Sequence, residues 1–254
     1  MNLIKKQFYV EQLDRMARLY IGLPDDYDLS DKRYPVLYMH DGQNVFLTND
    51  AFIGVTWGML ECFEKSTHPE IIVVALDSAE GDERLNEYGP FPFDVSKEFS
   101  DFGGKGDQYL DYIVHDLKPT IDAQYRTLSD PLNTGIMGAS MGGVISLYAG
   151  LKFPKVFGKV ASLSGSYFVS FDAFLEVIDQ AKPNKLHYVY IDTGTEEEAG
   201  GTPKDYLHVN KVVYEQLKAK MDEDKLEYLE IEGGRHTESD WGNRLRDILL
   251  RMFG

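Results

Sequence analysis

The sequence is poor in cysteine and in basic residues, and each shortage excludes a class of protein. Cys62 is the only cysteine among 254 residues, which excludes an intrachain disulfide framework and any C-x-x-C metal or redox site. Lys and Arg number 26 against 42 Asp and Glu, which gives a formal net charge of -16. A surface this acidic repels nucleic acid and anionic lipid, so we expect no nucleic-acid partner.

Long apolar runs are also missing. No segment approaches the roughly 18 consecutive apolar residues of a membrane-spanning helix. Residues 1–10 contain two lysines but no apolar run of the kind that forms a secretory signal. We therefore expect a cytoplasmic protein without a membrane partner.

What the chain does contain is a regular alternation of short apolar strands and amphipathic helices. The predicted strands are 7–10, 15–23, 35–39, 71–76, 135–137, 160–163, 186–191 and 228–231. The predicted helices are 56–65, 108–125, 141–153, 171–180, 206–220 and 240–253. This alternation indicates a parallel sheet covered by helices on both faces, formed by a single α/β domain over residues 1–254. Pro119 is expected to kink or split its helix.

Ser140 lies in the pattern Gly138-Ala-Ser140-Met-Gly142, directly after a predicted strand and directly before a predicted helix. This is the setting of a nucleophile elbow, in which glycines keep Cβ atoms out of the strand–helix crossing. The N–H of Met141 would then face the carbonyl oxygen of a bound substrate. The alternatives are a glycine-rich turn that only packs closely and a dinucleotide-binding loop. The second is disfavoured because the segment 160–165 holds no acidic residue for a ribose.

A serine nucleophile needs a histidine base that is oriented by a carboxylate. His236 follows the last predicted strand through a loop with two glycines and precedes the final helix, so it is the predicted base. Surface or capping positions are expected for His68, His187 and His208. His115 is expected on the polar side of its helix, and His40 belongs to a separate loop.

The predicted acid lies in the segment after the strand 186–191, which holds Asp192, Glu196, Glu197 and Glu198. A run of carboxylates is most often a solvated loop, and Asp192 stands early, at the strand end. We favour Glu197, with Glu196 and then Glu198 as alternatives.

The loop His40-Asp-Gly-Gln-Asn44 follows the predicted strand 35–39. A second oxyanion donor is expected there, and the N–H of Gln43 is the candidate. Gly42 would let the backbone approach the substrate closely. The simpler interpretation is an ordinary Asp-Gly turn.

These motifs resemble the esterase family of α/β-hydrolases that is related to esterase D, enterochelin esterase, and feruloyl, acetylxylan and tributyrin esterases. The resemblance extends over nearly the whole chain and rests on residues 37–46, 84–88, 134–143, 157, 162–164, 192–196 and 233–236. It implies the α/β-hydrolase fold, with Ser140 as nucleophile and His236 as base. In relatives the acid follows a glycine by three residues, which here is Glu197, although many relatives have aspartate at this point.

The resulting expectation is a serine esterase that needs no metal or cofactor and hydrolyses small acyl or aromatic-acid esters through an acyl-enzyme. The stretch 78–107 is predicted to be irregular, and a loop this long is expected to be functional. Its aromatic residues are Tyr88, Phe91, Phe93, Phe99 and Phe102. Candidate substrate contacts are Gly42, Arg84, Tyr88 and Tyr167. The alternatives are an acyltransferase that uses the same acyl-enzyme and a non-catalytic binding protein on a hydrolase scaffold. Homo-oligomerisation stays open.

Overall fold

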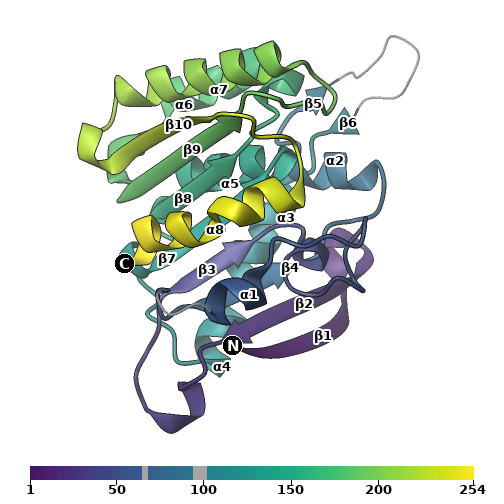
Figure 1. The fold of residues 1–254 in the computed structure, drawn as a ribbon, viewed down its shortest axis with the longest axis vertical. Coiled ribbons are helices and arrows are strands. Elements are labelled where there is room, and N and C mark those ends of the chain that lie inside the picture. The colour runs from purple at the N-terminus through teal and green to yellow at the C-terminus, as the bar shows by residue number, and fades with distance from the viewer. Residues whose placement is uncertain (65–67, 94–101) are drawn as a thin grey trace.

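A computed structural model describes residues 1–64, 68–93 and 102–254, which are organised around one eight-stranded sheet (Figure 1). The strands are β1 (Asn2–Val10), β2 (Arg15–Leu23), β3 (Val36–Met39), β4 (Ile72–Leu76), β7 (Thr134–Ala139), β8 (Lys159–Leu163), β9 (Tyr188–Gly194) and β10 (Leu226–Ile231). Their order across the sheet is β1-β2-β4-β3-β7-β8-β9-β10, and only the pairs β1/β2 and β2/β4 are antiparallel. The mostly parallel sheet confirms the predicted α/β-hydrolase fold.

Helices cover both faces of the sheet, as the alternation predicted. The helices α1 (Met59–Glu64) and α8 (Glu238–Phe253) lie together on one face (Figure 1). The other face is covered by α3 (Gly106–Tyr112), α4 (Lys118–Gln124), α5 (Met141–Lys152), α6 (Phe171–Gln180) and α7 (Pro203–Lys218). In the described ranges, no helix is both long and apolar enough to span a membrane.

Each face of the sheet has its own apolar core because successive strand residues point to opposite sides. In β3, Val36 and Tyr38 belong to the core under α3 to α7, whereas Leu37 and Met39 belong to the core under α1 and α8. All five residues of β4 are buried. A strand buried on both faces needs a continuous apolar run, which explains the sequence of β4.

The stretch 78–107 is not an irregular loop throughout. It contains the helix α2 (Glu83–Tyr88) and a two-stranded sheet of β5 (Pro92–Phe93) and β6 (Phe102–Gly103). Phe99 lies outside the described residues, as does Lys65 at the end of the predicted helix 56–65. The prediction of an irregular stretch was therefore wrong for these short elements, because six residues of amphipathic pattern are too few to stand out from a loop.

Pro119 does not divide its helix into separate segments. A π-helical turn, η4 (Ile113–Leu117), connects α3 directly to α4, and Pro119 is the second residue of α4. Proline lacks an N–H and collides with the carbonyl one turn earlier, so a wider turn before it relieves the conflict.

The sheet topology brings two predicted site loops together. From β3 the chain continues to β4 on one side, and it later returns to β7 on the other side of β3. Loops that follow the carboxyl ends of strands on either side of such a switch point diverge and leave a crevice between them. The loop after β3 contains Gln43, and Ser140 follows β7.

Candidate active site

Ser140 occupies a strained turn between β7 and α5. Its backbone has φ 61° and ψ -127°, a combination that a non-glycine residue rarely adopts. The flanking glycines make the turn possible: a Cβ at Gly138 would lie 2.7 Å from the Gly142 carbonyl oxygen, and a Cβ at Gly143 would lie 2.8 Å from Ser162 Oγ. The predicted strand, elbow and helix are therefore all present around this serine.

The structure brings one of the candidate carboxylates to His236. Glu197 Oε2 accepts a hydrogen bond from His236 Nδ1 at 2.6 Å. Glu197 is fully buried, and its other oxygen, Oε1, accepts from the Gly194 N–H at 2.8 Å and from the Ser164 hydroxyl. The neighbouring Glu196 and Glu198 are exposed. Glu197 is thus the member of the acidic run that contacts the predicted base.

Two glycine loops make this contact possible. The turn after β9 begins at Gly194, and the loop after β10 contains Gly234 and then His236. The Glu196 N–H donates to the Gly234 carbonyl oxygen at 2.9 Å, which ties the two loops together. A Cβ at Gly194 would lie only 2.0 Å from that same oxygen, so any side chain at this position would push the loops apart.

Asp192 has a different partner. It is fully buried in β9, where its oxygens accept from Arg244 of α8 at 2.6 and 2.9 Å and from the Tyr190 hydroxyl at 2.9 Å. Burial raises the pKa of Asp192, and the Arg244 guanidinium opposes this shift. The residue joins β9 to α8 and does not contact His236.

We expect Asp192→Ala to lower stability far more than activity. The change leaves the Arg244 guanidinium without its buried partner, which should cost about 3–5 kcal/mol in the free energy of unfolding. Urea denaturation measures the cost, and Asp222→Ala, which removes a surface pair with Lys225, should stay within about 1 kcal/mol of the unchanged protein. A selective loss of kcat/KM without loss of stability would instead assign Asp192 to the reaction.

Ser140 and His236 line one pocket of about 760 Å³. The imidazole is held between two aromatic rings, Tyr206 at a centroid distance of 5.0 Å and Trp241 at 4.9 Å. The hydroxyl of Ser140 lies within hydrogen-bond distance of Ser166 Oγ, at 3.1 Å. Among the described residues, it makes no hydrogen bond to His236.

Of the two candidate oxyanion donors, Gln43 lines the pocket, and Met141 directly follows Ser140 in the chain. Met141 is the first residue of α5, so its N–H has no acceptor within the helix. Gln43 lines the pocket, and its side chain is fixed by two hydrogen bonds to Ser78: Nε2 donates to Oγ at 2.9 Å, and Oε1 accepts from the N–H at 3.1 Å. The backbone of this loop is therefore held in place beside Ser140.

Gly42 was expected to let the backbone approach the substrate, but its close contact is with the sheet. A Cβ at this position would lie 2.7 Å from the Ala75 backbone in β4. The absent side chain lets the loop pack against the sheet, and Gly42 does not line the pocket.

Among the predicted substrate contacts, Arg84 lines the pocket and the two tyrosines do not. Arg84 donates through Nε and Nη2 to the two oxygens of Asp41, at 2.7 and 2.8 Å. Burial alone would raise the pKa of Asp41, but the guanidinium outweighs burial and lowers it, so this pair stays charged. Tyr88 and Tyr167 are fully buried. Their hydroxyls contact the Asp41 N–H at 2.9 Å and Ser162 Oγ at 2.6 Å, so direct contact with a substrate is not supported.

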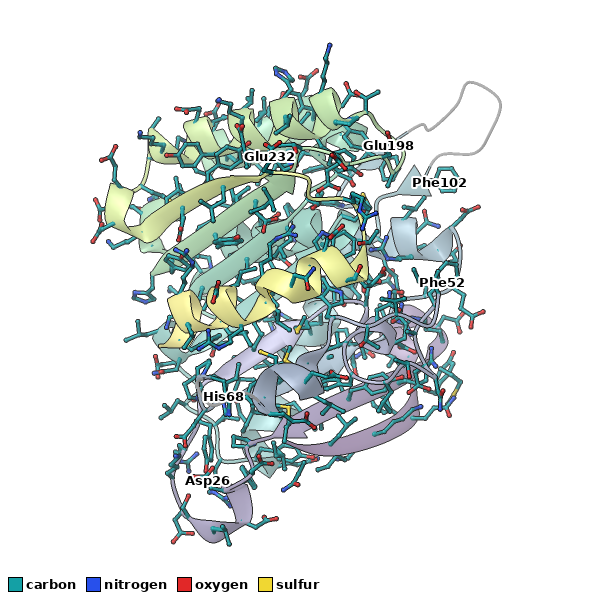
Figure 2. All side chains as sticks on the ribbon, viewed as in Figure 1. Asp26, Phe52, His68, Phe102, Glu198 and Glu232 are labelled. Carbon is teal, nitrogen blue, oxygen red and sulfur yellow. The ribbon has the colours of Figure 1, made fainter. Side chains whose placement is uncertain are left out.

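Several residues that line the pocket were not predicted from the sequence. These are Asn44, Phe52, Trp57, Glu238 and Trp241, among others. Asn44 Nδ2 donates to Glu238 Oε1 at 3.0 Å, and Asn44 Oδ1 accepts from the Phe52 N–H at 3.0 Å. Phe52 is 86% exposed, and it lies on the same edge of the molecule as Glu198 (Figure 2). A large apolar side chain in a turn is the sequence signal that could have identified Phe52.

The chain is similar in sequence to a known family and to several known proteins. The model of the family described as "Putative esterase" matches residues 10–252. The chain is 34% identical over 221 residues to the "Uncharacterized protein YbbA" of Bacillus subtilis (strain 168), covering 85% of this chain and 84% of that protein. It is 26% identical over 258 residues to an "Endo-1,4-beta-xylanase/feruloyl esterase" of Xylanibacter ruminicola, covering 99% of this chain and 31% of that protein.

A solved structure shows the same fold. The enterobactin esterase FES from Shigella flexneri superposes with a TM-score of 0.76 at 19% identity, covering 99% of this chain. The match spans 58% of that enzyme, so the chain corresponds to little more than half of its length.

Proposed function

Because the chain belongs to the esterase family whose model matches residues 10–252, we propose that it is a serine carboxylic-ester hydrolase that acts through an acyl-enzyme. The observation that carries the proposal is the 2.6 Å contact between Glu197 and His236, in the same pocket as a serine on a strained elbow. A buried carboxylate that orients an imidazole beside such a serine is the arrangement that activates a hydroxyl for attack.

In the proposed mechanism, Ser140 Oγ attacks the acyl carbon of the ester while His236 Nε2 takes its proton. Glu197 stabilises the imidazolium that forms, and the N–H groups of Gln43 and Met141 donate to the oxyanion. The tetrahedral intermediate then expels the alcohol, which receives the proton from His236. A water molecule, deprotonated by His236, attacks the acyl-enzyme and releases the acid and the free serine.

The pocket favours esters of small or aromatic acids. It combines the aromatic side chains of Phe52, Trp57 and Trp241 with the Asp41–Arg84 ion pair. Flat rings give an aromatic group a large apolar contact, and the charged groups give its polar substituents hydrogen-bond partners. The feruloyl esterase and the enterobactin esterase to which the chain is similar have names that support the same substrate class.

The proposal is tested with a panel of p-nitrophenyl, naphthyl, feruloyl and acetyl-sugar esters, each assayed with and without a serine-directed phosphonate. We expect hydrolysis of at least one aromatic or short acyl ester and complete loss of it after phosphonate treatment. Hydrolysis that persists in the treated protein would contradict a serine mechanism. An added acceptor alcohol distinguishes acyl transfer from hydrolysis by the product formed.

We expect kcat/KM to fall on the acid side of its pH profile, because the imidazole of His236 must be unprotonated to accept the proton of Ser140. His40 should not contribute, because burial lowers its pKa to about 3 and it stays neutral over the assay range. Replacing His40 by glutamine, measured on the fraction that folds, should leave the acid limb of the profile in place. An acid limb that follows His40 instead would contradict His236 as the base.

Chelators are expected to have no effect on turnover, since the proposed mechanism contains no metal step. The described residues also include no cluster of three or more His, Cys, Asp or Glu side chains arranged to hold a metal ion. Activity is compared before and after EDTA treatment, with a metal-dependent hydrolase treated in parallel. Loss of activity that added metal restores would refute the expectation.

A further inference from the structure

The hydroxyl of Ser140 is the first member of a hydrogen-bonded chain, a series of hydrogen bonds that does not include His236. Ser140 Oγ lies 3.1 Å from Ser166 Oγ, which lies 3.1 Å from the Tyr206 hydroxyl. The Tyr206 hydroxyl in turn donates to the Ala199 carbonyl oxygen at 2.7 Å. The chain therefore ends on a group that only accepts hydrogen bonds.

This end point fixes the direction of every bond in the chain, because each hydroxyl has one proton to donate. Tyr206 uses its proton on the Ala199 carbonyl oxygen, so its oxygen accepts the proton of Ser166. Ser166 has then used its own proton, so its oxygen accepts the proton of Ser140. In this arrangement the proton of the nucleophile points to Ser166, whereas the proposed mechanism requires it on the His236 side.

The surrounding structure holds the chain in place. The Ser166 N–H donates to the Ser140 carbonyl oxygen at 3.3 Å, so the two serines are linked twice. Asn210 Nδ2 donates to the Gly165 carbonyl oxygen and to the Tyr206 carbonyl oxygen, both at 2.9 Å, and thereby ties the loop of Ser166 to α7. Ser166 and Tyr206 are both buried. Burial raises the pKa of Tyr206 to about 12, which keeps its hydroxyl protonated at any assay pH.

We propose that Ser166 and Tyr206 are positioning residues that hold the Ser140 proton away from His236 in the free enzyme. Binding of the ester must then turn this hydroxyl toward His236 before attack, which makes the free serine less reactive than the triad alone would make it. The inference rests on the proposed function, since it assigns a resting state to the same nucleophile and base.

If Tyr206 acted only through its packing, replacing it would lower the reactivity of Ser140, whereas the proposal expects an increase. The ring of Tyr206 packs against His236, and a change that disturbed this packing would lower activity. Tyr206→Phe keeps the ring and removes the hydroxyl. Ser166 can then turn its proton to Ser140 Oγ, and the proton of Ser140 becomes available to His236. Ser166→Ala removes the acceptor directly and should have the same effect by an independent route.

The test measures the second-order rate constant for phosphorylation by diethyl p-nitrophenyl phosphate, followed by release of p-nitrophenolate. In this step Ser140 Oγ bonds to phosphorus, the bond from phosphorus to the p-nitrophenyl oxygen breaks, and His236 takes the serine proton. We expect Tyr206→Phe and Ser166→Ala each to react about threefold to tenfold faster than the unchanged protein, the effect of one neutral hydrogen bond removed from the resting state.

The pH profile of the same reaction is a second readout. A new hydrogen bond from Ser140 to Nε2 stabilises the neutral imidazole, so the acid limb should move to lower pH in both variants. The ionisable groups around His236 are Glu197 from the loop after β9, Tyr206 from α7, Glu238 from α8 and, across the pocket, Asp41 and Arg84. All of these are unchanged in Ser166→Ala, so a shift there comes from the serine contact itself.

The control is Tyr214→Phe, which removes another tyrosine hydroxyl from α7, at a ring that stacks on Tyr228 away from the pocket. It should match the unchanged protein in rate and pH profile. Equal or slower reaction of Tyr206→Phe or Ser166→Ala, with the acid limb unmoved, would overturn the inference, and so would an increase in only one of them. Absence of any reaction in the unchanged protein would instead contradict the proposed function.

Discussion

Replacing Ser140 by alanine is expected to abolish ester hydrolysis, with a fall in kcat of at least about 10⁴-fold. The alanine side chain has no atom that can form the acyl-enzyme, and no other described hydroxyl of the pocket lies on an elbow between the oxyanion donors and His236. What remains is the rate that binding and the oxyanion donors give to attack by water.

Stability should hardly change in the same variant. Ser140 is partly exposed, and its side chain contributes one hydrogen bond, to Ser166. Alanine carries a Cβ as serine does, so the strain at φ 61° is kept and the melting temperature neither gains nor loses from it. The loss of one neutral hydrogen bond limits the cost to about 1 kcal/mol.

The measurement is kcat/KM on the best ester of the panel, together with thermal unfolding and mass spectrometry after phosphonate treatment. Ser146→Ala is the matched control, since Ser146 lies in α5, the helix that follows Ser140, and its hydroxyl donates to the Gly142 carbonyl oxygen. It should keep its activity and its phosphonate adduct. Retention of more than a few per cent of activity in Ser140→Ala would contradict the serine mechanism.

The parts of the site that the sequence predicted are those that depend on local chain geometry. A strand, a G-x-S-x-G turn and a helix are neighbours in the sequence, so the strained conformation of Ser140 follows from residues next to it. The short apolar runs of the strands and the apolar stripes of the helices likewise reflect local periodicity, which is why the sheet and its helices agree with the prediction. The preference for Glu197 over its neighbours has a different source, since the family resemblance implies an acid three residues after Gly194.

The parts that the sequence did not predict depend on packing between distant segments. Tyr88 and Tyr167 are residue types that often line pockets, yet both side chains are fully buried in the protein interior. The Tyr88 hydroxyl contacts the Asp41 N–H, and the Tyr167 hydroxyl contacts Ser162 Oγ. Trp241 enters the pocket because α8 passes beside the loops after β8 and β9, where its Nε1 donates to Ser164 Oγ at 2.9 Å. Hydrophobic periodicity places such a ring on a buried helix face but does not say which loop it meets.

Replacing Glu197 by glutamine is expected to reduce kcat/KM by about 10³–10⁴-fold. Oε1 of Glu197 accepts two hydrogen bonds, from the Gly194 N–H and the Ser164 hydroxyl. Only the amide oxygen of glutamine can take that position, so the NH₂ group must face His236 Nδ1. An NH₂ donor there requires an unprotonated Nδ1 and therefore a proton on Nε2, the nitrogen that must accept the proton of Ser140. The geometry thus predicts the wrong imidazole tautomer as well as a lost negative charge.

The neighbouring glutamates supply matched controls for this prediction. Glu196 and Glu198 are exposed, and the described contacts do not bring either of them to His236, so Glu196→Gln and Glu198→Gln should remain within about twofold of the unchanged enzyme. Because Glu197 is fully buried between two glycine loops, an exposed neighbour cannot take its place without moving the Gly194 turn. Nitrogen NMR of the His236 ring reports the tautomer directly and should show the proton on Nε2 in Glu197→Gln. A severe loss in Glu196→Gln or Glu198→Gln, or a mild one in Glu197→Gln with the tautomer unchanged, would assign the acid to another carboxylate.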